Sequence, residues 1–466
     1  MSSTSAASAE MWQRSEIPVV DLTGAHLRVS LLRKIVLWTV GAYLILNGGF
    51  DTVRFPPVGA GIPAGELVLL ICLCIISVRT LLPRMGAAVW LFPIVVWWGM
   101  SLSRALIDTS VGGVWSFRDA TQAIESLYLI VGFWLVNSVG NLQYFFNWLR
   151  KVLIALGFYG LLMPFSTTLQ AFSPKLSGMS SGASSLFFQK VNSSSMLLWC
   201  ACWLLIDRPA NPRSTKVRVL ITLFLVTFSI AYAQGRTGYL SVLAVGAILL
   251  LVKRRVAAKW VGILLFGVVI IGAISVSGLK LQGGRGHTIS LNYITQEFES
   301  ISGSAQSEDV EGSAKGVPLR LGWWRRIYSK MEASPQKMIF GLGYGIPLTD
   351  FHATGGVQVR EPHDSYISVV ARLGISGMLV WIMMQASLYF SWWRSYQLCK
   401  RMQWTRDQNN LLLLLIFDVL ILVFAIGEDG FEKPFNAIPY YFFFGVVLRY
   451  GRYLRLTAAQ AGSNTY

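Results

Sequence analysis

Hydrophobic stretches close to the length of a membrane-crossing helix recur along almost the whole chain, and each is bounded by clusters of Arg, Lys, Pro or Gly. A helix needs about 20 mostly apolar residues to cross a hydrocarbon core of about 30 Å. The 466 residues are 54% hydrophobic and only 14% charged, which is unusual for a soluble domain. The pattern therefore predicts an all-α fold, a polytopic helical bundle in a lipid bilayer.

We expect about twelve transmembrane helices and one large, partly helical outer loop. The apolar runs place helices near residues 33–50, 64–82, 86–102, 121–138, 150–165, 186–206, 217–234, 238–252, 259–279, 364–391, 410–427 and 435–449. The predicted organisation is a cytoplasmic N-terminal tail (1–30), helices 1–9 (31–279), a large periplasmic loop (280–362), helices 10–12 (363–455) and a cytoplasmic C-terminal tail (456–466).

The net charge of +17 by itself could suggest nucleic-acid binding. The basic residues, however, are scattered through short loops and do not form one stripe, so no nucleic-acid partner is expected. If the N-terminus is cytoplasmic, the short inner loops are consistently basic, as topology in membranes requires. Both termini are then predicted to face the cytoplasm, and membrane lipids are the expected surroundings.

The first candidate site is a short outer turn, Arg236-Thr237-Gly238-Tyr239-Leu240, between two apolar helices. An arginine at this place stands against the topological charge bias. Its guanidinium offers a rigid fork of donors that can grip phosphate oxygens and does not lose its charge. The residue type suits a lipid diphosphate at the membrane surface, although an arginine that only touches lipid headgroups would give the same pattern.

The second candidate is His363, where the outer loop re-enters the membrane ahead of an apolar helix. At 100° per residue, His363, Ile367, Val370, Gly374 and Gly377 fall within about 40° of one helix face. A titratable base above small residues could receive a lipid tail or let a neighbouring helix approach closely. The alternative is a histidine that caps or packs at the helix start, with glycines that serve helix contact only.

The outer loop contains two more features on which the sequence allows an expectation. Pro318 suits the first turn of a helix, and Leu319, Trp323, Ile327 and Met331 recur every four residues beside Arg320, Arg325, Arg326 and Lys330. We expect this helix to lie along the membrane surface, with a basic face that could merely rest on anionic headgroups. The run Phe340–Gly345 predicts a flexible turn that returns the loop toward the membrane, since no strand and crossover helix surround it as in a nucleotide-binding loop.

Two other groups of polar residues leave alternatives open. A metal site formed by Asp350, His352, His363 and Asp364 is conceivable, but the spacing matches no familiar cage. Asp418 lies inside an apolar run and must face the bundle interior or be neutral. It either satisfies an internal polar group or belongs to a proton path.

The order of these motifs resembles that of a known family. An Arg-x-x-x-Leu turn (Arg236 to Leu240) is followed by a long outer loop with an Arg, then Trp and Gly-x-Gly, and by a His with glycines 11 and 14 residues later. Together they resemble the bacterial O-antigen ligase and O-antigen polymerase superfamily over roughly Arg236 to Trp381. The twelve-helix layout extends the resemblance loosely over the chain.

The resemblance implies a glycosyltransferase that moves a glycan from an undecaprenyl-diphosphate carrier to a glycan or lipid A-core acceptor. It implies no metal or cofactor, and it places the reaction at the periplasmic face of the bacterial inner membrane. His363 matches the family histidine, which is proposed to assist attack by the acceptor hydroxyl. Arg236 and Arg320 match the arginines of the turn and of the loop, both expected to bind diphosphate. A single direct displacement predicts inversion at the anomeric carbon.

One further candidate and one departure from the family pattern concern the neighbours of His363. Arg360, three residues earlier, is a further candidate for diphosphate binding. Asp364 stands where the family usually shows Asn, Ser or Gln. An acidic neighbour would raise the histidine pKa by favouring imidazolium, which bears on the role of His363 as a base.

A transporter or flippase of lipid-linked oligosaccharide is the competing class. It requires charged residues along a path through the bilayer centre. Here the central charges are few, chiefly Asp418, Glu125 and Arg372, whereas the candidate residues gather at one predicted surface. The sequence does not separate ligase from polymerase, because these share donor and chemistry and differ in the acceptor.

Overall fold

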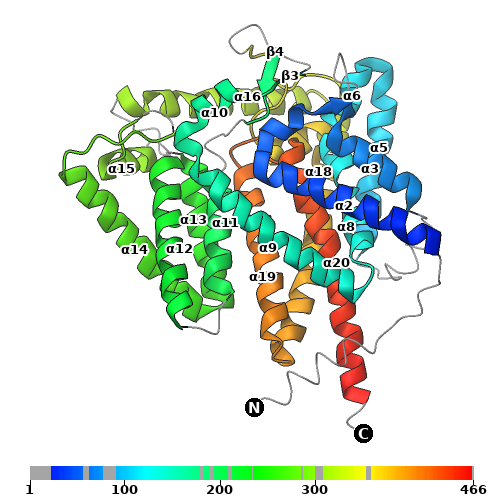
Figure 1. The fold of residues 1–466 in the computed structure, drawn as a ribbon. Coiled ribbons are helices and arrows are strands. Elements are labelled where there is room, and N and C mark those ends of the chain that lie inside the picture. Colours follow the sequence, from blue (N-terminus) through cyan, green and yellow to red (C-terminus); the bar gives the residue numbers. More distant parts are fainter. Residues whose placement is uncertain are drawn as a thin grey trace.

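The computed structural model describes residues 23–55, 62–76, 91–178, 182–187, 194–207, 212–233, 235–284, 287–299, 308–352 and 358–463. Long helices run side by side between the two ends of a bundle, and shorter helices gather at one end (Figure 1). The predicted helical class therefore fits the described part of the chain.

The elements follow one another along the chain with few strands. The first half contains α2 (Thr23–Leu46), α3 (Ala64–Ile75), α5 (Phe92–Gly112), α6 (Val114–Asp119), α7 (Thr121–Glu125), α8 (Tyr128–Leu135), α9 (Val139–Leu161), α10 (Ser166–Phe172) and α11 (Ser194–Ile206). The second half contains α12 (Pro212–Ala233), α13 (Arg236–Val252), α14 (Arg254–Val276), α15 (Leu291–Glu299), α16 (Glu308–Glu332), α17 (Pro335–Phe340), α18 (Ser365–Arg401), α19 (Thr405–Ala425) and α20 (Pro434–Ser463). The described residues also contain two 3₁₀ helices (Asn47–Thr52, Met163–Phe165) and two antiparallel strand pairs: β1 (Arg54–Phe55) with β2 (Ile62–Pro63), and β3 (Lys175–Gly178) with β4 (Gly182–Ser185).

Five helices of the described residues are long and apolar enough to cross a membrane. They are Leu31–Thr52, Arg213–Tyr232, Arg254–Val276, Ser365–Arg401 and Thr405–Ala425. The pair Val139–Leu161 and Met163–Phe172, bent by 53°, makes a sixth if it is counted as one span. Four more apolar helices, Ala64–Ile75, Thr121–Leu135, Ser195–Ile206 and Arg236–Val252, are shorter. The predicted count of about twelve transmembrane helices is therefore not confirmed.

Several predicted helix bounds were wrong. The helix predicted at 121–138 is divided into α7 and α8, and the one predicted at 150–165 begins at Val139. The last helix continues to Ser463 instead of ending near residue 449. Arg449 does not end it, because its guanidinium stacks on Phe133 and Tyr453, at 5.1 and 5.0 Å from the ring centroids. Arg449, at which the predicted helix ended, is thus accommodated inside the helix by its aromatic neighbours.

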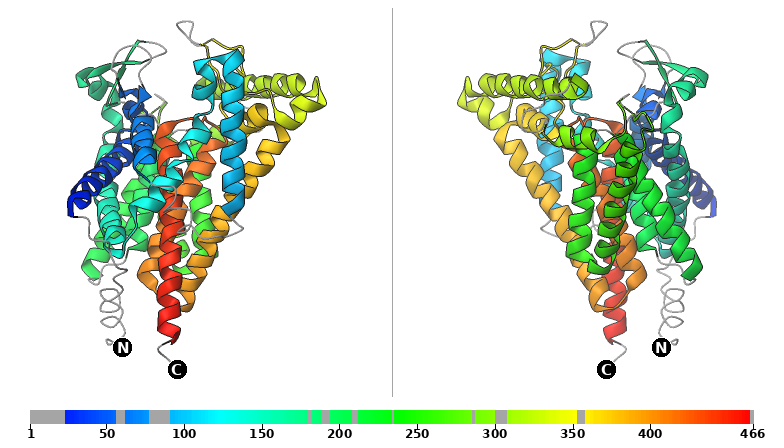
Figure 2. Two further views of the ribbon diagram at one scale, coloured as in Figure 1. Left: turned by 90° about the vertical axis from the view of Figure 1, so that its right-hand side faces the viewer. Right: turned by 90° about the vertical axis from the view of Figure 1, so that its left-hand side faces the viewer.

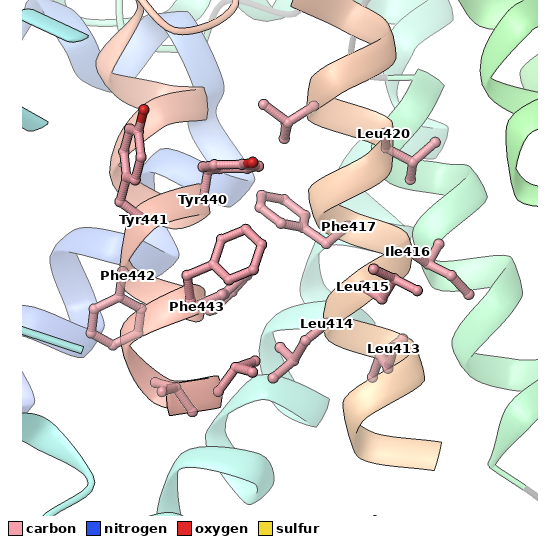
Figure 3. Close-up of a cluster of buried hydrophobic side chains, with 14 of the residues drawn as sticks. Leu413, Leu414, Leu415, Ile416, Phe417, Leu420, Tyr440, Tyr441, Phe442 and Phe443 are labelled. Atoms are coloured by element: carbon pink, nitrogen blue, oxygen red, sulfur yellow. The ribbon is translucent and has the colours of Figure 1, made fainter. Parts of the chain in front are cut away.

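The core lies where α19 and α20 face each other. Figure 3 shows Phe417 of α19 pointing toward Tyr440 and Phe443 of α20, whereas Ile416 and Leu420 lie on the side of α19 away from α20. Phe417 and Phe443 meet edge to face with ring centroids 4.9 Å apart. The ring centroid of Trp199 in α11 lies 4.7 Å from that of Phe417. The indole N–H of Trp199 donates to the Leu413 carbonyl at 2.8 Å. Aromatic packing and the Trp199 hydrogen bond stabilise this centre.

Two glycines allow α8 and α20 to pack backbone against backbone. A Cβ at Gly132 would overlap the Phe442 carbonyl oxygen, and one at Gly445 would overlap that of Leu129. Small residues let two helices approach closely because no side chain separates their backbones. In lipid this close packing matters, since no hydrophobic force drives helices together. The two positions are reciprocal, each glycine facing the other helix.

We expect Gly445→Ala to destabilise the protein, because the added methyl meets backbone that cannot rotate away. Overpacking of this kind costs about 1–3 kcal/mol. Gly262→Ala, in α14 where nothing lies within 4 Å of the added Cβ, is the matched control. The temperature of half-aggregation in detergent is measured for both. Equal temperatures for the two variants would contradict the close approach of α8 and α20.

Candidate active site

Helix α16 lies across one end of the bundle instead of along its length (Figure 2). Trp323, Ile327 and Met331 are buried, and Ile327 and Met331 pack with Leu348 and with Ala371 of α18. The predicted apolar stripe is confirmed for these three residues, whereas Leu319 is exposed. The apolar face thus packs on the protein itself.

The start of α16 was predicted wrongly. The helix begins at Glu308, and Pro318 lies inside it. Pro318 is exposed, so water can compensate the backbone hydrogen bond that proline does not make. On the basic face, Arg325 is exposed, and Arg326 and Lys330 pair with Asp350 at 3.6 and 3.8 Å.

The glycine-rich segment after α17 forms the predicted turn and is held by hydrogen bonds. Gly341, Gly343 and Gly345 have φ of +79°, +88° and +85°, a conformation in which a side chain would be strained. The backbone N–H of Tyr344 donates to Asp108 at 2.7 Å, and that of Gly345 donates to Asp119 at 3.0 Å. These contacts fix the loop on α5 and α6.

Arg360 is buried in an ion-pair network at the same place. Its guanidinium binds both oxygens of Asp119, at 3.0 and 2.6 Å, donates to the Gly345 carbonyl at 2.9 Å, and lies 4.5 Å above the Trp115 ring. Arg372 of α18 adds a second cation, 3.1 Å from Asp119 and 2.8 Å from Glu361 (a residue of the same loop). These contacts hold the loop that carries Arg360 and Glu361 against α6 and α18. The role of Arg360 in diphosphate binding stays a prediction.

Helix α18 is interrupted at Gly374, so the continuous small-residue face expected below His363 is wrong. Gly374 has φ +69° and ψ −169°, which no helical residue adopts. A Cβ there would overlap the Ile339 carbonyl oxygen. Because the helix is interrupted, backbone carbonyls just before Gly374 accept hydrogen bonds from the glycine-rich loop. The Leu342 N–H donates to the Ala371 carbonyl at 2.7 Å, and the Gly343 N–H donates to the Arg372 carbonyl at 3.1 Å. Gly374 serves a close approach of backbone, and the break gives the loop its hydrogen-bond partners.

His363 precedes this helix in a left-handed backbone conformation, with φ +53°. That conformation is rare for residues other than glycine and is found preferentially at functional sites. Its Nδ1 lies 3.3 Å from an Asp429 oxygen and 3.6 Å from a Glu428 oxygen. The ring is also 5.9 Å, centroid to centroid, from that of Trp323. The imidazole is therefore held between α16 and the α19–α20 loop, with 31% of its side chain exposed.

Carboxylates determine the protonation of His363. Burial alone would lower its pKa, but the neighbouring Asp429 and then Glu428 outweigh burial and Arg320, so the pKa lies above its usual value. The direction agrees with the expectation, but the acidic neighbour was misassigned. Asp364 caps α18, accepting from the Ile367 N–H at 2.9 Å, and burial raises the pKa of Asp364 to about 6.

Arg320 lies on the other side of the same acidic loop. It donates to the Gly427 carbonyl at 2.6 Å and pairs with Glu428 at 3.5 Å. A Cβ at Gly427 would lie 2.8 Å from the methyl group of Thr237. Glu428 therefore contacts both His363 and Arg320, and the Arg236–Leu240 turn lies against the adjacent glycine. The residues of the two sequence motifs meet at one end of the bundle.

Arg236 begins α13 and faces α15. Its guanidinium lies 3.5 Å from Glu297, which is fully buried and accepts a hydrogen bond from Tyr293 at 2.9 Å. About a fifth of the Arg236 side chain is exposed. Arg236, Arg320 and His363 each have a carboxylate partner, so cations and anions alternate across this end.

Sequence reasoning missed the acidic loop between α19 and α20. Glu428, Asp429 and Glu432 lie in a short turn between two apolar helices. Burial raises the pKa of Glu432 to about 8, with Asp429 and Glu361 adding to the rise, and Glu432 accepts from the Ser365 hydroxyl. The sequence signal for this loop is the presence of three acidic residues in one short turn between two apolar helices. Carboxylates repel an anionic diphosphate, so the expected chemistry points to basic residues and away from this turn.

The conceivable metal cage is not assembled. Asp350 pairs with Arg326 and Lys330, whereas His363 pairs with Asp429. Over the ranges that the structure describes, no group of three or more His, Cys, Asp or Glu side chains is arranged around a common point. Asp418 is fully buried, as expected of a residue that must face the bundle interior.

Comparison with known families identifies the part of the chain that carries these motifs. Residues 221–382 match the family model described as O-antigen ligase. This segment, 162 of the 466 residues, is similar to the O-antigen ligase family. It runs from α12 through the first half of α18 and includes Arg236, Arg320 and His363. The acidic loop lies outside the matched residues. No curated protein matches the chain.

We expect Asp429→Asn to lower the pKa of His363, because a carboxylate that favours imidazolium is removed while burial persists. With Glu428 still present, only part of the rise is expected to be lost. The chain has only four histidines, so selective ¹⁵N labelling with a pH titration by NMR measures the value, and His363→Gln assigns the signal. Asp350→Asn, which removes an exposed carboxylate paired elsewhere, is the control. An unchanged His363 pKa in Asp429→Asn would contradict the pairing.

Proposed function

We propose that the protein transfers a glycan from an undecaprenyl-diphosphate carrier to an acceptor sugar at the periplasmic face of the inner membrane. The similarity to the O-antigen ligase family supports a ligase or polymerase role in polysaccharide biosynthesis. The observation that carries the proposal is the line of contacts from His363 through Glu428 to Arg320 and Gly427, with Thr237 beside it. A base and two arginines are thereby gathered at one end of a membrane bundle.

His363 acts as the general base in this proposal. Its Nδ1 faces Asp429 and Glu428, which leaves Nε2 as the nitrogen that takes the proton from the acceptor hydroxyl. The hydroxyl oxygen forms a bond to the anomeric carbon as the bond from that carbon to the diphosphate oxygen breaks. Asp429 stabilises the imidazolium that results, and the diphosphate leaves with the bonding electron pair. A direct displacement of this kind inverts the anomeric carbon.

Arg236 and Arg320 are the diphosphate ligands in the proposal. Both are partly exposed, at 22% and 33% of their side chains, and both begin or line helices at this end. Positive charge fixed beside the leaving group stabilises the negative charge that grows on the diphosphate oxygens. The guanidinium fork also holds two oxygens at once, which sets the orientation of the sugar.

Transport of a lipid-linked oligosaccharide is the alternative. Arg372 and Glu361 pair with each other at the outer end, so neither is a free charge in mid-bundle. Glu125 and Asp418 are fully buried. The observations favour transfer. Purified protein that joins glycan in detergent, with no second compartment, would exclude transport as the essential activity.

We expect His363→Ala to lower glycan transfer at least about a hundredfold while the protein is still made, because a positioned base contributes roughly 10²–10⁴ to a rate. Transfer by purified protein is measured with lipid-diphosphate-linked glycan. His352→Ala, at an exposed histidine of the same loop, is the control.

The accompanying gel of surface polysaccharide separates the two reactions. Core that bears a single repeat indicates a lost polymerase, and polymer that accumulates on the lipid carrier indicates a lost ligase. Normal polymer in His363→Ala would remove His363 as the base. A retained anomeric configuration in the product of the unaltered protein would contradict direct displacement.

We expect Arg320→Gln to weaken binding of an undecaprenyl diphosphate roughly ten- to a hundredfold, since one charge-assisted contact is worth about 1.5–3 kcal/mol. Binding of the monophosphate should change less, so the preference for diphosphate falls. Arg325→Gln, which removes an exposed charge of the same helix, is the control. Equal losses of monophosphate and diphosphate binding in Arg320→Gln would show that Arg320 acts only through its contact with Gly427.

A further inference from the structure

A pocket of about 640 Å³ opens at the end of the bundle opposite His363. It lies where α9, α11, the α13–α14 junction and the start of α19 meet. Helix α13 has 17 residues and leads from Arg236 to this pocket, a distance of about 25 Å along its axis. The pocket is therefore separate from the proposed transfer site. The charge pattern predicts this end to be cytoplasmic.

Positive charge dominates the lining of the pocket. Its cations come from three places in the chain: Arg150, Lys253, Arg254, Arg255 and Arg406. Asp207 is the carboxylate among the described lining residues, and it already pairs with Arg218 at 3.5 Å. Lys253 donates to Asn409. The four arginines of the lining form no ion pair with any residue that the structure describes.

Two helix starts add to the positive field. Residues Arg254–Val256 are the first turn of α14, and Thr405 and Arg406 begin α19. Neither start has a side-chain cap among the described residues. Helix N-termini with unoccupied N–H groups favour anions, and phosphates in particular. The cationic side chains and both helix starts thus act on the same space.

The other wall of the pocket is apolar. It is formed by Phe146, Leu149, Trp203, Ile206, Val256 and Leu413. A soluble phosphate compound gains nothing from such a wall, whereas a lipid places its acyl chains there. The pocket also lies within the range of about 300–1,000 Å³ that is usual for bound organic ligands. Charge and apolar surface together fit a molecule with an anionic head and a hydrocarbon tail.

We propose that this pocket binds an anionic phospholipid, with the phosphodiester headgroup held by Arg254, Arg255 and Arg406. Basic pockets between helices at the cytoplasmic side of membrane proteins suit such headgroups. The assignment does not depend on the glycan transfer proposed above. The lipid would join α9, α11, α14 and α19 at the end of the bundle away from the reaction.

The test is native mass spectrometry of the delipidated full-length protein in detergent. Phosphatidylglycerol and phosphatidylcholine with the same acyl chains are compared, with glycerol 3-phosphate and inorganic diphosphate as soluble probes. The triple variant Arg254→Gln, Arg255→Gln, Arg406→Gln should retain phosphatidylglycerol at least about tenfold less. A second variant, with Lys at the same three positions, should recover most of the binding and thereby excludes misfolding as the cause.

The matched control removes three exposed charges outside the pocket, Lys259, Lys400 and Arg401, each changed to Gln. It should bind phosphatidylglycerol as the unaltered protein does. The site would be overturned if the unaltered protein retained phosphatidylcholine as well as phosphatidylglycerol. It would also be overturned if the control variant lost as much phosphatidylglycerol as the triple variant. Tighter binding of glycerol 3-phosphate or diphosphate than of phosphatidylglycerol would overturn the assignment to a lipid.

Discussion

A buried group of four charges holds the loop before α18 against the helix bundle. Asp119 forms ion pairs with both Arg360 and Arg372, and Arg372 also pairs with Glu361. Burying one of these charges alone would cost several kcal/mol, so the arrangement persists only with all four in place. Since they belong to α6, to the outer loop and to α18, pairing them fixes the loop on the bundle. His363 follows Glu361 by two residues and is positioned by that anchor.

Segments far apart in the chain are brought together by this constraint. The break of α18 at Gly374 offers carbonyls to the loop, and the loop in turn brings the backbone of Pro362 to Trp324 of α16, whose indole N–H donates to it at 3.3 Å. With α16 held across the bundle, Arg320 reaches Gly427. The left-handed backbone of His363 is then determined by contacts on both sides.

Features that follow from local period or residue chemistry could be predicted from the sequence. The helical class, the buried stripe of α16 and the burial of Asp418 are of this kind, because each depends on spacing or on the cost of exposing a charge to lipid. The partner of His363 could not be predicted, since Asp429 lies 66 residues away and only the packing of α18 on α19 and α20 brings it near. The interruption at Gly374 was missed because its cause, the Ile339 carbonyl, is likewise distant in sequence.

The pairing of each arginine with a carboxylate has a consequence for turnover. Glu297 and Glu428 already neutralise Arg236 and Arg320 when no substrate is bound. In the proposed reaction an arriving lipid diphosphate would have to displace these carboxylates, so part of its attraction to the arginines would be spent on separating existing ion pairs. The same carboxylates compete for the guanidinium groups once the sugar has been transferred. We infer that these internal competitors keep the spent carrier from remaining bound, a requirement for any catalyst whose product is more highly charged than its substrate.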